Sequence, residues 1–168
     1  MKPGADFFAA DVLDAAPALL GKILVRKLGD AELRLRITET EAYRGEEDTA
    51  CHAHKGKTPR TEVLYRAPGT IYIYLCYGVH WLLNLVTGPE GTPQAALIRG
   101  VEGAAGPGRV TRRLGLDKRF NGASVLTCDE FWLEDDGFRP AYRADERVGI
   151  AYADEADRKK LWRYIVDC

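Results

Sequence analysis

Apolar and polar residues alternate along residues 22–43, which is the pattern of a β-hairpin with one buried face. The run KILVRKLGDAELRLRITETEAY turns at Gly29, between two arms of strand-forming residues. In the second arm Leu33, Leu35 and Ile37 alternate with polar residues, so they share one face of the strand. We expect that face to be buried.

The other elements are predicted from the same kinds of pattern. Helical spacing covers residues 11–20, with Pro17 inside, and residues 106–116. Polar, turn-rich residues 44–61 predict a loop, with or without a short helix. Strands are predicted on both sides of Gly78 within 69–87, and at 94–102, 124–135 and 147–153, before a charged, aromatic tail. Hairpins join most of these strands, so we expect an α+β fold with a mostly antiparallel sheet and flanking helices.

Length and charge narrow the picture. A chain of 168 residues with 46% hydrophobic composition is long enough for one well-cored domain and short for two, so residues 1–168 are expected to form a single domain. The net charge of −1 gives no overall signature of nucleic-acid binding. Basic residues do gather at 109–119 and acidic ones at 129–136, but such clusters are more often solvated surface than binding sites.

The chain has no membrane-spanning pattern and no paired cysteine spacing. No stretch reaches the roughly twenty apolar residues that a span needs, so we expect a soluble, intracellular protein. The four cysteines lie far apart, which fits neither a zinc knuckle nor a disulfide framework, and they are expected to be reduced: Cys51, Cys76, Cys128 and Cys168. The cysteine spacing therefore predicts no standard metal site.

Two charged residues interrupt apolar patterns. Glu41 continues the parity of Leu35 and Ile37, where a buried side chain is expected. Either the sheet edge has left the core and exposed this carboxylate, or the carboxylate is held in a pocket as a general base. Arg99 has only apolar residues and glycine around it, so its guanidinium requires an anionic partner. That partner could be a structural ion pair or a carboxylate that Arg99 orients together with a water.

An amide and several tyrosines form a second set of candidates. Asn84 lies inside an apolar strand, either as a satisfied core amide or as a side chain that lines a pocket. Core packing is the ordinary role of Tyr74, although with Tyr43 it could also form a slot that stacks a planar ligand. Tyr77 adjoins the Gly78 turn, so it should project outward, as an aromatic wedge between bases would.

In order and spacing, four segments resemble the alkyladenine (3-methyladenine) DNA glycosylase family: ITETEAYRGEEDTACHAHKGKTPRT, APGTIYIYLCYGVHWLLNLVT, ALIRGVE and GPGRVTRRLGL. The resemblance covers residues 19–116 and resumes weakly at RVGI and LWRY. It implies a single mixed domain on a curved antiparallel sheet. It also implies a base-excision repair enzyme that flips an alkylated or deaminated purine out of duplex DNA and hydrolyses its N-glycosidic bond.

The resemblance also implies roles for individual residues. Glu41 matches the general base, and Arg99 the residue that helps to hold the attacking water and the carboxylate. Tyr43, His52 and Tyr74 match the rings around the flipped base. Asn84 matches the side chain that obstructs the guanine 2-amino group, and Tyr77 the residue inserted into the space that the nucleotide leaves.

Other expectations concern DNA and the reaction. Phosphate contacts are expected from Lys57, Arg60 and Arg109. No lysine matches the pocket, so we expect a monofunctional enzyme. We also expect it to need no cofactor and to act as a monomer on double-stranded DNA. Its expected location is the cytoplasm, on the nucleoid, if bacterial, or the nucleus if eukaryotic. The chain is shorter than usual members after Glu102 and at its C-terminus, which leaves the ranking of damaged bases open.

Two alternatives remain at this point. Cys51, His52 and His54 could be metal ligands of a hydrolase, although their spacing fits no standard site. The protein could instead bind damaged DNA without cleaving it, against which the presence of Glu41 argues.

Overall fold

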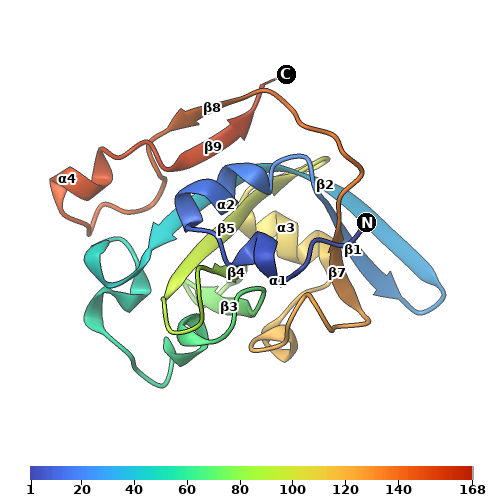
Figure 1. Ribbon diagram of the computed structural model, residues 1–168, viewed down its shortest axis with the longest axis horizontal. Coiled ribbons are helices and arrows are strands. Elements are labelled where there is room, and N and C mark those ends of the chain that lie inside the picture. Colours follow the sequence, from blue (N-terminus) through green and yellow to red (C-terminus); the bar gives the residue numbers. More distant parts are fainter. Residues whose placement is uncertain (168) are drawn as a thin grey trace.

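One antiparallel sheet organises residues 1–167, the part of the chain that the computed structural model describes (Figure 1). Its strands are β1 (Ile23–Leu28), β2 (Ala31–Arg44), β3 (Ile71–Cys76), β4 (His80–Thr87), β5 (Gln94–Val101), β6 (Ala104–Ala105), β7 (Phe131–Glu134), β8 (Tyr142–Asp145) and β9 (Arg163–Val166). The main order is β3-β4-β5-β2-β1-β7, with β6 beside β5 and β9 joining β8 to β2. The expected α+β fold with a mostly antiparallel sheet is confirmed.

Short helices flank this sheet: α1 (Ala5–Phe8), α2 (Val12–Ala18), α3 (Pro107–Leu114) and α4 (Glu155–Arg158). The side chain of Asp11 caps α2 by accepting a 2.9 Å hydrogen bond from Leu13 N, and Pro17 falls in its last turn. Four 3-10 turns connect the elements: η1 (Gly45–Glu47), η2 (His52–Lys55), η3 (Glu62–Tyr65) and η4 (Lys118–Phe120). Within residues 1–167 no helix has both the length and the apolar character needed to cross a bilayer.

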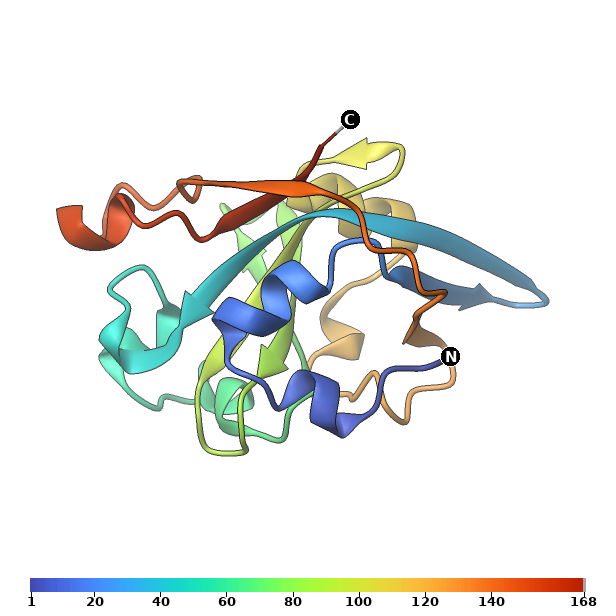
Figure 2. The same cartoon turned by 45° about the horizontal axis from the view of Figure 1, so that its top comes forward.

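The main core lies between the sheet and the helices. Helix α2 packs across β2 and β5, as Figure 2 shows, while α3 packs against β4 and β5. Alternate residues of β3 and β4 enter this core, namely Ile71, Ile73, Leu83 and Leu85. Because side chains of a strand alternate between faces, the residues between them point to the opposite side of the sheet.

A β-bulge in β2 changes which residues face the core. Ile37 pairs with Val101 and is buried there, but the register with β5 shifts on both sides of Glu39. Beyond the shift the even-numbered residues turn inward, and Thr40 donates a 2.8 Å hydrogen bond to Ala16 O of α2. The bulge has room because Gly100 lies opposite, where a Cβ atom would come within 3.2 Å of Glu39 Cβ. Glu41 therefore points to the face opposite the core.

One predicted strand is absent, and another is shorter than predicted. Residues 147–153 form a loop, because Val148 N bonds to the Glu41 carboxylate and Ala153 N to Ile150 O, and neither bond belongs to a strand ladder. In the segment 124–135 only β7 is a strand, since Cys128 N turns back to Ser124 O at 2.8 Å. Strand β8 precedes residues 147–153, where no strand was predicted, and β9 lies in the charged tail. The sequence patterns also did not predict α1.

Candidate active site

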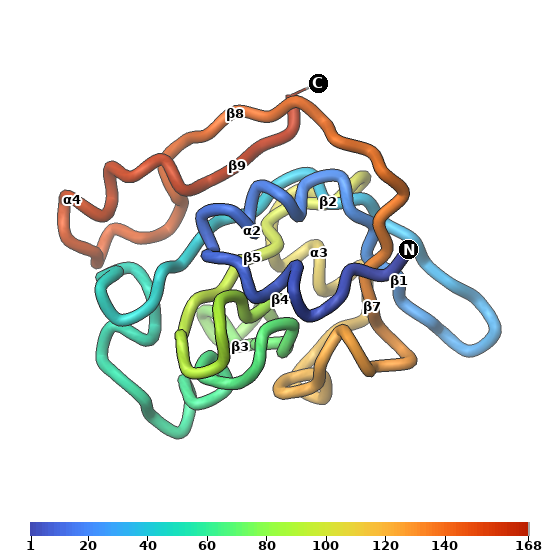
Figure 3. Tube along the Cα trace, in the orientation of Figure 1, coloured from blue at the N-terminus to red at the C-terminus, as the bar shows by residue number. Residues whose placement is uncertain are grey.

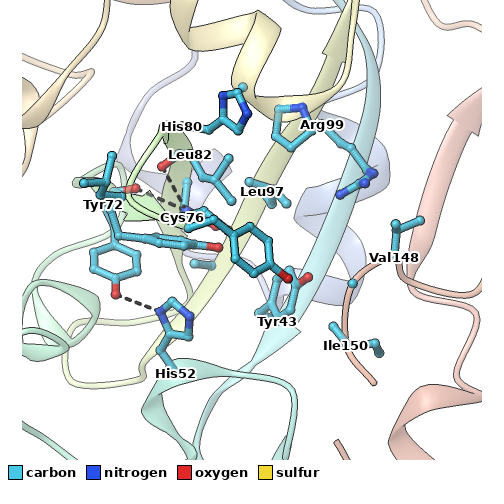
Figure 4. A pocket seen from close by; sticks show the side chains of 18 of the residues that line it. Tyr43, His52, Tyr72, Cys76, His80, Leu82, Leu97, Arg99, Val148 and Ile150 are labelled. Carbon is cyan, nitrogen blue, oxygen red and sulfur yellow. Dashed lines mark hydrogen bonds between the residues drawn. The ribbon is translucent and has the colours of Figure 1, made fainter. Parts of the chain in front are cut away.

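A pocket of about 860 Å³ lies on the face of the sheet opposite the main core (Figure 4). Its walls come from β3, β4, β5, the η2 turn, the start of α3 and the loop 148–152. The trace in Figure 3 brings residues 45–66 next to residues 147–160, far away in the sequence. Asp48 pairs there with Arg147 at 2.6 Å, and Thr49 N bonds to Asp157 at 3.0 Å. These contacts close one side of the pocket.

Glu41 lies behind the pocket wall and has no exposed surface. Its Oε1 accepts a 2.8 Å hydrogen bond from the Tyr43 hydroxyl, and its Oε2 accepts one of 2.8 Å from the Val148 backbone N–H. Both donor residues line the pocket. Of the two interpretations of Glu41, solvent exposure at a sheet edge is therefore wrong.

Arg99 lies between two carboxylates. Its Nη1 is 3.5 Å from Glu41 Oε1, and its Nε is 3.4 Å from Glu39 Oε2. Arg163 of β9 also reaches Glu39 Oε2, at 3.2 Å. Arg99 therefore has two anionic partners, as its apolar surroundings require at least one. The second carboxylate, Glu39, is already shared with Arg163, so Arg99 remains available to Glu41.

Burial raises the pKa of the Glu41 carboxyl, because its charged form loses hydration. Arg99, the Val148 N–H and the Tyr43 hydroxyl favour the charged form and limit this rise in pKa. Burial also raises the pKa of Tyr43 well above its usual value, so its hydroxyl keeps its proton and remains a donor. The result is a fixed carboxylate with increased proton affinity, as a proton acceptor requires.

The three predicted base-contacting rings, Tyr43, His52 and Tyr74, all line this pocket. The rings of His52 and Tyr74 are in contact, with centroids 4.5 Å apart and planes at 66°. Tyr43 reaches the pocket from β2, and its hydroxyl connects the aromatic wall to Glu41. The pocket can therefore surround a planar ligand and place its edge near the buried carboxylate.

Tyr72 joins this group although it was not predicted as a site residue. His52 Nδ1 lies 2.9 Å from the Tyr72 hydroxyl, the dashed contact in Figure 4, and the Tyr72 and Tyr74 rings are 5.4 Å apart. Burial, together with the charge of Arg60, lowers the pKa of His52 to about 4. His52 is therefore a neutral ring at physiological pH, and its contact with Tyr72 fixes its orientation.

Asn84 and Tyr77 occupy opposite extremes of exposure. Asn84 is buried at the pocket wall, where its Nδ2 donates to the backbone oxygens of Tyr72 at 3.3 Å and Leu82 at 3.4 Å. Its amide is satisfied and also lines the pocket, so the two interpretations of Asn84 describe the same position. Tyr77 is 90% exposed at the tip of the β3–β4 hairpin, as its place beside Gly78 predicts.

The predicted phosphate-binding residues divide into two groups. Arg60 and Arg109 line the pocket, and the Arg60 guanidinium lies 5.3 Å from the Tyr74 ring centroid. Lys57 is exposed and outside the pocket wall, with its Nζ 5.6 Å from the Tyr65 ring centroid. The segment after Glu102 forms a tight connection through β6 and leads directly into α3, on which Arg109 lies.

Sequence reasoning missed the loop that completes the site. Arg147 is buried and stacks against the Tyr43 ring at 5.0 Å, while Val148 supplies a backbone donor to Glu41. Tyr152 lines the pocket and donates a 2.6 Å hydrogen bond to Ala50 O. A buried arginine next to a strand-like run could have been noticed, but a backbone N–H leaves no trace in residue type.

The three alternative metal ligands point to different partners. Cys51 Sγ lies 3.8 Å from Pro93 O, and His54 Nδ1 lies 2.8 Å from Glu46 O, whereas His52 contacts Tyr72. Nowhere in the described part of the chain do three or more histidine, cysteine or carboxylate side chains gather in a way that could hold a metal ion. The arrangement therefore does not support Cys51, His52 and His54 as one ligand set.

Known proteins match almost the whole chain. The profile of methylpurine-DNA glycosylases (MPG) matches residues 6–105 and 102–168. A protein of Psychrobacter cryohalolentis named "Putative 3-methyladenine DNA glycosylase" is 41% identical, over 95% of this chain and 89% of its own. Proteins with the same name are 39% identical in Borreliella burgdorferi ZS7, over 95% and 93% of the two chains, and 37% identical in Clostridium perfringens SM101, over 99% and 96%.

Together, the fold, the carboxylate behind an aromatic pocket and these matches define a DNA glycosylase, a hydrolase of N-glycosyl bonds. The chain belongs to the methylpurine-DNA glycosylase family, which acts in the base excision repair of alkylated purines. The expected family resemblance is confirmed.

Proposed function

We propose that this protein flips a damaged purine of the 3-methyladenine type out of duplex DNA and hydrolyses its N-glycosidic bond with Glu41 as the general base. The position of Glu41 carries the proposal. A fully buried carboxylate with raised pKa, held by the Tyr43 hydroxyl and the Val148 N–H beside an aromatic pocket, is arranged to accept a proton.

In the reaction, a water molecule attacks C1′ of the deoxyribose while the bond from C1′ to the purine nitrogen breaks. The bonding electron pair leaves with the base, the water oxygen bonds to C1′, and Glu41 takes the proton. Positive charge builds on the sugar during bond breaking, so an anionic Glu41 also stabilises the transition state. Arg99, 3.5 Å from Glu41, favours the ionised carboxylate and helps to orient the water.

The pocket supplies recognition of the base. Tyr43, His52 and Tyr74 offer aromatic surfaces around a planar purine, and the buried Asn84 amide limits the room for an additional amino group. Tyr77, which projects from the hairpin tip, fills the space that the flipped nucleotide leaves in the duplex.

No lysine is among the pocket-lining residues of the described chain, so the nucleophile is water and the enzyme is monofunctional. Borohydride should therefore trap no covalent adduct of protein and DNA. We further propose that the protein acts as a monomer, on the nucleoid in a bacterial cytoplasm or in a eukaryotic nucleus. Lys57, Arg60 and Arg109 would contact phosphates, so binding should weaken as salt increases.

The decisive experiment measures base release from duplexes that carry 3-methyladenine, 7-methylguanine, hypoxanthine or ethenoadenine. Glu41→Gln should reduce release by roughly 10²- to 10⁴-fold, because the amide cannot take the proton, while lesion binding is largely retained. The Tyr43 hydroxyl can rotate to accept from the new amide, so the fold should tolerate the change.

Glu39→Gln is the matched control, because Glu39 contacts the same Arg99 but makes no contact with Tyr43 or Val148 in the described structure. Its effect on release should be much smaller than that of Glu41→Gln. Release by Glu41→Gln at the native rate would refute the role of Glu41. Tight binding of lesions without any release by the native protein would instead support a damage binder.

A further inference from the structure

Arg60 is a cation without a carboxylate partner on the wall of the base pocket. It lies between η2 and η3, and its guanidinium is 5.3 Å from the centroid of the Tyr74 ring. Arg66, Arg99 and Arg147 each pair with a carboxylate, whereas no carboxylate within residues 1–167 forms an ion pair with Arg60. Its charge is therefore not neutralised locally and faces the space that a ligand would enter.

Groups inside the pocket respond to this charge. Arg60 adds to burial in lowering the pKa of His52, and it opposes the rise that burial causes in the pKa of Tyr72. Both rings contact Tyr74, with centroids 4.5 Å and 5.4 Å away. A base stacked against Tyr74 would thus lie within range of the same positive potential.

Damaged purines differ in the charge of the base, to which a positive potential responds. 7-Methylguanine and 3-methyladenine are cationic in DNA and become neutral when they leave. Hypoxanthine and ethenoadenine are neutral and acquire negative charge as the glycosidic bond breaks. At equal extents of bond breaking the two classes differ by one unit of charge on the base, so one fixed cation favours the neutral class.

Building on the proposed function, we propose that Arg60 is a specificity-determining residue that shifts selection away from cationic purines and toward neutral ones. The charge of Arg60 has two effects, and both favour neutral purines over cationic ones. Its charge opposes the entry of a cationic base onto Tyr74, and it stabilises the negative charge that develops on a departing neutral base. Arginine keeps its own proton at any physiological pH, so this effect is electrostatic and not acid catalysis.

Arg60 is exposed at the pocket rim, so water screens its charge and the effect should be moderate. One unit of charge on a base stacked against Tyr74 would lie about as far from Arg60 as the Tyr74 ring does, 5.3 Å. In a largely aqueous setting this interaction corresponds to roughly a fivefold change in the ratio of the release rates of cationic and neutral bases.

The experiment compares second-order rate constants for base release from duplexes with 7-methylguanine and with hypoxanthine, in the native protein and in Arg60→Gln, Arg60→Lys and Arg60→Glu. Arg60→Gln should raise the ratio of 7-methylguanine to hypoxanthine release roughly fivefold. Arg60→Glu should raise this ratio further. Arg60→Lys should leave the ratio near the native value, because lysine keeps the positive charge.

Lys57→Ala is the matched control for a phosphate contact, since Lys57 is an exposed cation close to Arg60 in sequence that does not line the pocket. It should lower release of both bases by a common factor and leave the ratio unchanged. If Arg60→Gln behaves in the same way, Arg60 is only a phosphate contact and the inference is wrong. If the native protein releases none of the four damaged bases, the proposed function fails, whereas release with an unaltered ratio in all Arg60 variants refutes this inference alone.

Discussion

The floor of the pocket and the tip of the β3–β4 hairpin are built in opposite ways. At the floor, Glu41, Asp48 and Arg147 are charged and almost completely buried, and each has hydrogen-bonding or ionic partners. At the tip, Tyr77 is 90% exposed and Val79 is 67% exposed. Tyr77 also has a φ of +53°, an uncommon conformation for a residue with a side chain.

The floor is preorganised for the reaction, whereas the tip is arranged to bind a partner. Donors at the floor already point at Glu41, so little needs to reorganise before the reaction. The tip keeps apolar surface in water, where it contributes little to folding and can be buried only against a partner. Substitutions that leave a buried charge at the floor without its partner should therefore lower stability and activity together, whereas substitutions at the tip should lower activity with little change in stability.

Arg147→Met should have the largest effect on stability. The Arg147 guanidinium bonds bidentately to Asp48, at 2.6 Å and 3.0 Å, and also to Ala42 O at 2.9 Å. Its removal leaves a buried Asp48 charge, which should lower the free energy of unfolding by about 3–5 kcal/mol. Urea denaturation measures this loss.

Arg147→Lys is the control, because it retains the charge but not the planar fork, and it should recover part of the lost stability. Base release by the folded fraction of Arg147→Met should fall as well, since Arg147 backs Tyr43 and precedes the Val148 donor. An unfolding free energy of Arg147→Met equal to the native value would contradict the account of the floor.

His52 should make stability depend on acid pH. Its folded pKa of about 4 lies below the ordinary value of 6.5, so the unfolded chain binds more protons between these values. Stability is therefore complete above about pH 6.5 and is lost as the pH falls toward 4, by about 2 kcal/mol after allowance for partial exposure.

Denaturation at several pH values between 4 and 7 tests this, with His52→Gln expected to reduce the slope. His54 is the internal control, because it is exposed on the same 3-10 turn. If His54→Gln removes the slope and His52→Gln does not, the assignment to the pocket ring is wrong.

Residue types revealed the parts of this structure that depend on local pattern. The arm 31–44 is a strand, α2 ends before Gly21, and the hairpin turns at Gly78, as alternation, helical spacing and glycine predict. Glu41 and Arg99 stood out because each interrupts an apolar pattern, and the structure brings them within 3.5 Å.

Contacts over long distances in sequence could not be predicted in this way. The bulge at Glu39 depends on space beside Gly100, so parity alone assigned Glu41 to the core face. The run 147–153 has the composition of a strand, but the burial of Arg147 against Asp48 makes it a loop. The backbone N–H of Val148 became part of the site only through that loop.

The smallest expected stability effect tests the tip. Tyr77→Gly should raise the free energy of unfolding by about 0.5–1 kcal/mol, because glycine adopts a positive φ without steric cost. Tyr77→Ala keeps the strained backbone and should leave stability nearly unchanged. Both variants lack the wedge, so both should release base from duplexes roughly tenfold or more slowly than the native protein. Thermal unfolding and single-turnover release separate the two quantities, and fast release by Tyr77→Ala would show that the exposed ring has no part in flipping.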